Sequence, residues 1–251
     1  MVGTFSDIGN VRSVNEDYLD YYEDKYKSVY IIADGMGGHN AGEVASKMAV
    51  EETMKYIKAE NWESNDLIDI ENVLVNAIEK ANRKIFKLAQ SDSSTKGMGT
   101  TITACIVKNG EMVVANVGDS SCFIIFNNKI HKATKDHSLV QQLVDMGSIT
   151  ENEAKTHPNK NIITRALGTN YSVKVDTFFF NMKDIEKVIL CTDGLTNSLS
   201  HEEILEIVDN NEIPAACEKL INVSKEKDGR DNISVIIFEG ACENDRNSFG
   251  K

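Results

Sequence analysis

The class of fold is indicated by residues 100–117, which read TTITACIVKNGEMVVANV. Two runs rich in β-branched and apolar residues, 100–107 and 111–117, are separated only by Lys108-Asn109-Gly110. Because parallel strands need a crossover of a dozen or more residues, this short connection predicts an antiparallel hairpin. Further strands of the same kind are predicted at 28–33, 121–126, 173–180, 187–192 and 233–238.

Two long stretches of the first half have the spacing of amphipathic helices. Residues 41–59 and 67–90 each place their apolar side chains on one stripe, which must be buried. Shorter helices are predicted near 201–209, after a capping-box sequence, and near 213–226, with a proline in the first turn. We therefore predict an α+β fold in a single domain, residues 1–242, with an irregular flap at about 145–165 and a polar tail at 243–251.

The composition excludes several classes of function. The chain has 27 Lys and Arg against 39 Asp and Glu, a formal charge of −12, which would repel nucleic acid and anionic lipid. No apolar run approaches the ~20 residues of a membrane span, and the N-terminus lacks the features of a signal peptide. Five widely spaced cysteines without a C-x-x-C pair read as reduced thiols. We expect a soluble, cytoplasmic protein.

Aspartates stand at the ends of four predicted strands. They are Asp34, Asp119, Asp193 and Asp231, and each has a glycine or asparagine beside it. Turn chemistry explains any one of them alone. It explains the set less well, because Asp34-Gly35 and Asp193-Gly194 are each followed by a helix, directly or after a short loop, and not by a second strand.

Carboxylates gathered in a partly desolvated cleft repel each other unless a cation binds. An all-oxygen ligand set selects Mg²⁺ or Mn²⁺ over zinc, and the Gly35 carbonyl could add a further ligand. The nearby run RSVNED at 12–17 adds Glu16, Asp17 and Arg12. Taken alone it favours a surface ion-pair run, whereas beside a metal cluster the planar fork of Arg12 could hold a phosphate.

These residues resemble the metal-dependent protein phosphatases (PPM, type 2C), in the compact bacterial single-domain form. The resemblance runs from about Phe5 to Phe238 and rests on eight motifs in family order. The motifs are RSVNED at 12–17, ADGMGGH at 33–39, GMGTT at 97–101, NVGDS at 116–120, DHSL at 136–139, ITRALG at 163–168, TDGL at 192–195 and GRDN at 229–232. The resemblance implies a four-layer αββα sandwich of two antiparallel sheets flanked by helices.

The resemblance also implies a role for each site residue. Asp34 would bridge two Mn²⁺ or Mg²⁺ ions, the Gly35 carbonyl would bind one of them, and Asp193 and Asp231 would hold the other. Glu16 and Asp17 would bind metal directly or through water. Asp119, together with Asp193, would hold a third, weaker ion. Arg12 would bind the phosphate.

The implied activity is a hydrolase reaction in signalling, the removal of phosphate from serine and threonine side chains by direct attack of a hydroxide that bridges the ions. His39 is a candidate for the acid that protonates the leaving oxygen, or it only orders the glycine-rich loop. Expected partners are phosphoprotein substrates and a cognate Ser/Thr protein kinase, with the chain a monomer.

Two alternatives compete with this interpretation. One takes Gly35–Gly38 as a nucleotide-phosphate cradle, but the spacing matches neither G-x-G-x-x-G nor a Walker loop. The other is a non-catalytic relative that binds phosphoproteins or a kinase. Such chains lose metal carboxylates, whereas all four strand-end aspartates are present here.

Overall fold

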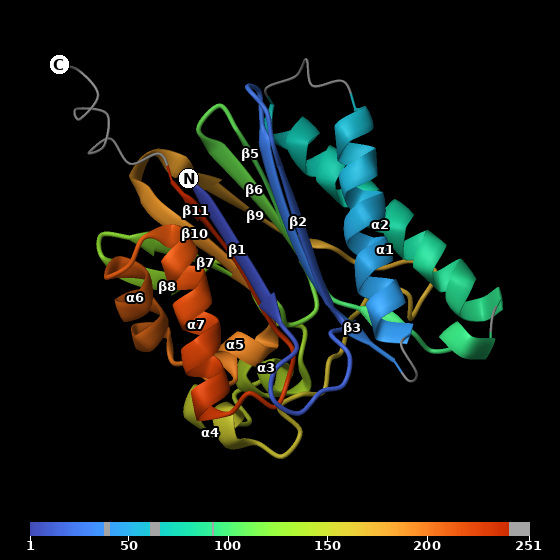
Figure 1. Cartoon of the computed structure of the whole chain (residues 1–251). Helices are drawn as coiled ribbons and strands as arrows, with labels where there is room; N and C mark the ends of the chain where they lie inside the picture. The colour runs from blue at the N-terminus through green and yellow to red at the C-terminus, as the bar shows by residue number, and fades with distance from the viewer. Residues whose placement is uncertain (38–40, 61–65, 92, 241–251) are drawn as a thin grey trace.

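Two antiparallel β-sheets lie face to face, with helices on both outer faces (Figure 1). The computed structural model describes residues 1–37, 41–60, 66–91 and 93–240. The first sheet has the order β1 (Val2–Asp7), β11 (Ile233–Glu239), β10 (Ile185–Cys191), β7 (Ser121–Phe126), β8 (Lys129–Lys132). The second has the order β2 (Asp17–Glu23), β3 (Ser28–Met36), β5 (Ile102–Lys108), β6 (Glu111–Val117), β9 (Asp176–Asn181), with β4 (Gly99–Thr100) paired to the end of β3.

The helices form the two outer layers. The second sheet is covered by α1 (Ala41–Ala59) and α2 (Leu67–Ser91), and the first by α6 (His201–Asp209) and α7 (Ile213–Lys227). The remaining helices are short: α3 (Leu139–Asp145), α4 (Glu151–Thr156), α5 (Asp193–Thr196), and the 3₁₀ turns Ser93–Thr95 and Met182–Asp184. The four-layer α+β sandwich is therefore confirmed.

Three buried layers fill the spaces between these elements, and β3 shows how the sequence builds two of them. Val29 and Ile31 face the helices α1 and α2, whereas Tyr30 and Ile32 face the other sheet. The Tyr30 ring stacks on Phe238 of β11 at 3.8 Å between centroids. Alternate side chains of a strand point to opposite faces, so a strand buried on both faces is apolar throughout.

Most predicted elements are found, with shifts at their ends. The β5–β6 hairpin is confirmed, and Asn109 and Gly110 both have positive φ, of 53° and 81°, as its tight turn requires. The prediction that the strand from Ser28 ends at Ala33 was wrong. It continues to Met36, because β4 pairs with Gly35 and Met36.

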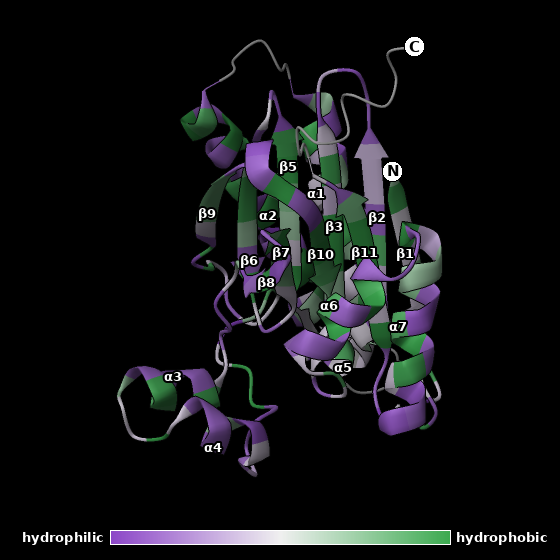
Figure 2. Cartoon of the chain, turned by 90° about the vertical axis from the view of Figure 1, so that its left-hand side faces the viewer, coloured by the Kyte–Doolittle hydropathy of each residue, from purple (hydrophilic) through white to green (hydrophobic). Residues whose placement is uncertain are grey.

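The segment between β8 and β9 carries α3 and α4 and stands apart from the two sheets (Figure 2). Ser138 caps α3, and Thr150 and Glu153 form a capping box at the start of α4. The segment lies at the same end of the sandwich as α5. The predicted tail, 243–251, lies outside the described residues. Within the part of the chain that the structure describes, no helix combines the length and apolarity that a membrane crossing needs.

Candidate functional site

Four of the predicted acids meet at one end of the sandwich, where both sheets contribute. Asp17 begins β2 and is the register partner of Asp34 in β3. Asp193 follows β10 as the first residue of α5, and Asp231 lies two residues before β11. Because β10 and β11 are antiparallel neighbours, the end of one lies beside the start of the other. The pairing of the two sheets therefore brings these acids together.

The environment of these acids disfavours their charged form. Burial raises the pKa of Asp17 to about 7, with further contributions from the charges of Asp193 and Asp231. Burial and the charge of Asp193 raise the pKa of Asp119 to about 8. The pKa of Asp34 lies well above its ordinary value, because of burial and then the charge of Asp17. The site therefore carries more negative charge than it can hold without cations or protons.

The charge of Asp193 also raises the pKa of Asp34. Asn197 also donates to Asp193, with Nδ2 2.9 Å from Oδ2. The pKa of Asp193 is raised by burial and by the charge of Asp231, and the hydrogen bond from Asn197 partly offsets this rise.

Two carboxylate oxygens of the site are buried and have no hydrogen-bond donor. They are Oδ1 of Asp17 and Oδ1 of Asp119. Among the described residues, no three His, Cys, Asp or Glu side chains converge as a complete ligand set. Mg²⁺ and Mn²⁺ do not require one, because such hard ions keep several waters and bind through one or two carboxylates. The potential metal ligands of the site are all oxygen atoms, and two of them have no hydrogen-bond partner. Both properties fit hard divalent cations.

Glycines allow helix α1 to approach these acids. A Cβ added to Gly35 would lie 2.1 Å from the Gly42 carbonyl oxygen and 2.6 Å from that of Glu16. A Cβ on Gly42 would lie 2.4 Å from Glu16 Oε1. The N–H of Gly35 donates to the Glu16 carbonyl at 3.0 Å. No larger residue fits between the start of α1 and the loop that precedes β2.

Arg12 and Glu16 lie at the edge of the acidic site. Arg12 Nη2 is 2.9 Å from the carboxylate of Asp231, and about half of the arginine side chain is exposed. Burial raises the pKa of Glu16, and the charge of Arg12 opposes that effect. Since an arginine has five N–H donors, its bond to Asp231 leaves others for an anion.

The backbone before Asp119 is held by His137. The N–H of Gly118 donates to His137 Nδ1 at 3.0 Å, and the N–H of His137 donates to the Gly118 carbonyl at 2.9 Å. Gly118 has a φ of 111°, which favours glycine. His137 Nε2 in turn lies 3.1 Å from Asp176 Oδ2. The 136–139 motif thus has a structural role in placing Asp119.

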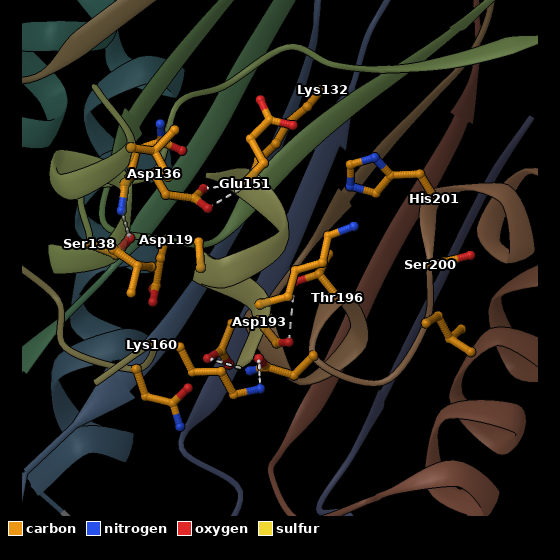
Figure 3. Close-up of a pocket in the computed structure, with 18 of the residues that line it drawn as sticks. Asp119, Lys132, Asp136, Ser138, Glu151, Lys160, Asp193, Thr196, Ser200 and His201 are labelled. Carbon is orange, nitrogen blue, oxygen red and sulfur yellow. Dashed lines mark hydrogen bonds and ion pairs between the residues drawn. The ribbon is translucent and has the colours of Figure 1, made fainter. Parts of the chain in front are cut away.

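A cavity of about 580 Å³ opens beside the acids, between α3 and α4 on one side and α5 and the start of α6 on the other. Asp119 and Asp193 are among the residues that line it, together with Lys132 and His201 (Figure 3). Lys160 reaches across to α5 and donates to Asn197 Oδ1 at 2.9 Å. The cavity therefore connects the acidic site with the segment that carries α3 and α4.

Four polar residues to which the sequence analysis gave no role hold the acids in place. Asn197 bonds Asp193, and Asn232 Oδ1 accepts the N–H of Glu16 at 2.8 Å. Thr192 and Ser234 both donate to Asp17. Ser234 had a visible signal, as the one polar residue in the run ISVIIF. His39, the candidate acid, lies outside the described residues, so its role stays a prediction.

Comparison with known proteins gives a consistent result. The family model described as Protein phosphatase 2C matches residues 10–233. A serine/threonine phosphatase, stp, of Listeria innocua is 38% identical and the match covers 93% of each chain. The crystal structure of the serine/threonine phosphatase Stp1 from Staphylococcus aureus has a TM-score of 0.89 at 35% identity, over 95% of this chain and 94% of that one.

A second solved structure is that of the catalytic domain of the serine/threonine protein phosphatase PstP in complex with two manganese ions. It has a TM-score of 0.81 at 31% identity, and the match covers 96% of this chain and 97% of that one. With a family match over most of the chain and relatives of this identity, the chain belongs to the protein phosphatase 2C family.

Proposed function

We propose that the acidic site at the end of the sandwich is the catalytic centre of this serine/threonine phosphatase. Membership of the family gives the chain its reaction, the hydrolysis of phosphate from serine and threonine side chains. The observation that carries the assignment to this site is the pair of buried, donor-free oxygens of Asp17 and Asp119 among further acids with raised pKa values. A phosphatase that needs cations has a use for such oxygens.

The residues that would hold the cations come from both sheets. Asp34 and the Gly35 carbonyl would bind from β3, and Asp193 and Asp231 from the ends of β10 and β11. Asp17 and Glu16 would bind directly or through water, and Asp119 with Asp193 would hold a third, weaker ion. Two divalent ions bound there would activate a water near neutral pH and offset the charge of the phosphate.

The chain's own side chains would orient the phosphate. Arg12 lies beside Asp231 and keeps free N–H donors, so it can bind phosphate oxygens while staying at the edge of the site. His39 remains our candidate for the acid that protonates the departing serine or threonine oxygen. The cavity between Asp119, Asp193 and the α3–α4 segment would receive the residues beside the phosphorylated side chain.

Some predictions from the sequence are more specific than family membership supports. Phosphoproteins are the substrates. We still predict a cognate Ser/Thr kinase as a partner, a monomeric state and a cytoplasmic location, and we expect the ion to be either Mn²⁺ or Mg²⁺. The non-catalytic alternative gains no support, because the relatives are named as phosphatases and the acids that such a chain would lose are present.

The decisive test is hydrolysis of a phosphothreonine peptide and of a small aryl phosphate with Mn²⁺, Mg²⁺ or EDTA. We expect activity with added metal and none in EDTA, and a fall of at least ~100-fold in kcat/KM for Asp193→Asn. Asp184→Asn is the matched control, because Asp184 precedes β10 at the opposite end from Asp193. Undiminished activity in EDTA, or equal activity of the two variants, would rule the proposal out.

A further inference from the structure

The two carboxylate oxygens of Asp17 differ in their partners. Oδ1 has no hydrogen-bond donor, whereas Oδ2 accepts two hydrogen bonds from buried hydroxyl groups. Thr192 Oγ1 donates to it at 2.9 Å and Ser234 Oγ at 2.7 Å. Asp17 belongs to β2 in one sheet, whereas Ser234 lies in β11 and Thr192 directly follows β10 in the other. These two bonds therefore join the sheets at the end where the acidic site lies.

When Asp17 is ionised, the hydrogen bonds that link Ser234 to Asp17 and to Ser6 have one consistent direction. A serine hydroxyl has one proton, and Ser234 gives its proton to Asp17. Ser6 Oγ, 2.7 Å from Ser234 Oγ, must then donate to it, and Ser6 accepts in turn from Asn15 Nδ2 at 2.9 Å. Asn15 Oδ1 accepts the backbone N–H of Asp17 at 3.1 Å. The network therefore begins and ends on Asp17.

This arrangement fixes which oxygen of Asp17 is available. Both hydroxyl donors bind Oδ2, so Oδ1 stays buried and free of donors. Asp17 is also the direct register partner of Asp34. A carboxylate held by one oxygen across the two sheets presents its other oxygen in a fixed place.

We propose that Ser234 and Thr192 are positioning residues, which hold Asp17 across the junction of the two sheets and so set the affinity of the site for divalent cations. The inference rests on the proposed function, because it requires that the site bind Mn²⁺ or Mg²⁺. Both residues act through Asp17, and Ser6 supports Ser234 from the edge strand β1. Partners that orient metal ligands typically change metal affinity 10- to 100-fold when they are removed.

Calorimetric titration of the full-length chain with Mn²⁺ tests the proposal without measuring activity. We expect Ser234→Ala to weaken Mn²⁺ binding about 10-fold, and Ser234→Thr, which keeps the hydroxyl, to bind nearly as the wild type does. Ser46→Ala is the matched control, since it removes a buried hydroxyl of α1 that donates to the Glu43 carbonyl. It should leave the affinity unchanged.

Thermal unfolding in EDTA separates a positioning effect from a loss of folding. Should Ser234→Ala fail to fold, Ser6→Ala and Thr192→Val replace it, because Ser6 lies on the exposed edge strand and valine keeps the shape of threonine. If the wild type binds no Mn²⁺, the proposed function fails as well. If the wild type binds Mn²⁺ and every folded hydroxyl variant binds it as tightly as Ser46→Ala does, only this inference is wrong.

Discussion

Asp17 and Asp119 each keep one buried oxygen without a donor, although a buried polar atom without a partner costs about 1–3 kcal/mol. Elsewhere at the site the chain provides partners readily: Asn197 binds Asp193, and Thr192 and Ser234 bind the other oxygen of Asp17. The bare oxygens are therefore not the result of a shortage of donors nearby. A cation that binds them would remove this cost, which is why we assign them to the metal site.

At Gly35 we predict that even a methyl group is too large. The Cβ of Gly35→Ala would lie 2.1 Å from a backbone oxygen of α1, so the helix start must move away from the site. We expect a loss of about 1–3 kcal/mol of unfolding free energy, measured by urea denaturation, together with weaker Mn²⁺ binding.

Gly3→Ala is a milder comparison, because its Cβ would meet a side-chain methyl of Ile213 at 2.8 Å. That methyl group can shift more easily than backbone. Gly35→Ala with wild-type stability and metal affinity would show that α1 does not constrain the site as we describe.

Among the elements, those with a strong local signal were predictable from the sequence. The turn at Asn109-Gly110 and the apolar stripes of α1 and α2 identified their elements correctly. β1 and β2 were missed, because both are edge strands with many exposed positions and lack a continuous apolar run. β8 was missed because it is only four residues long and mostly exposed.

The ends of elements at the site depended on contacts that the sequence does not display. Asp34 was expected just after a strand, but it lies inside β3, because the two residues of β4 extend the pairing. The gathering of Asp34, Asp193 and Asp231 was predictable, since each stands beside the end of a predicted strand and within a motif. Ser234 stands out in the sequence as the one polar residue of the run ISVIIF, but its partner Asp17 lies in the other sheet, so the bond between them is found only in the tertiary structure.

The α4 element gives a prediction about substrate choice. Replacing residues 149–158 with a short Gly-Ser linker removes α4 and one wall of the cavity but none of the acids. We expect kcat/KM for a small aryl phosphate to change less than threefold, while preference among phosphoproteins changes markedly. A panel of phosphopeptides measures this, and an equal loss on small and large substrates would contradict a role of α4 in selection.

For the molecule as a whole, the metal-free protein should lose stability as the pH rises. The pKa of Asp17 is raised to about 7 and that of Asp119 to about 8, above their ordinary value of 3.8. The folded state thus holds protons that the unfolded state has released, so the stability from these groups is lost progressively as the pH rises from their ordinary pKa of 3.8 to about 7–8. Each tenfold change in proton affinity is worth about 1.4 kcal/mol.

Thermal unfolding in EDTA between pH 5.5 and 8.5 measures this effect. The Tm should fall by several degrees, because about 1 kcal/mol moves the Tm of a chain of this size by about 2–4 °C. Mn²⁺ should raise the Tm more at pH 8.5 than at pH 5.5, where protons compete with the ion. Asp17→Asn, which cannot ionise, should show a smaller fall in EDTA. A flat profile in the wild type would count against the charge crowding that we describe.

Acids from both sheets lie at one end of the sandwich, where we propose that they bind divalent ions together. Anomalous diffraction from a crystal soaked in Mn²⁺ tests this proposal most directly, because the signal locates the ions independently of activity. We predict at least two manganese peaks enclosed by Asp34, Asp193 and Asp231, with Asp17 beside them. Manganese peaks only elsewhere on the surface, with none beside Asp34, Asp193 and Asp231, would contradict the account.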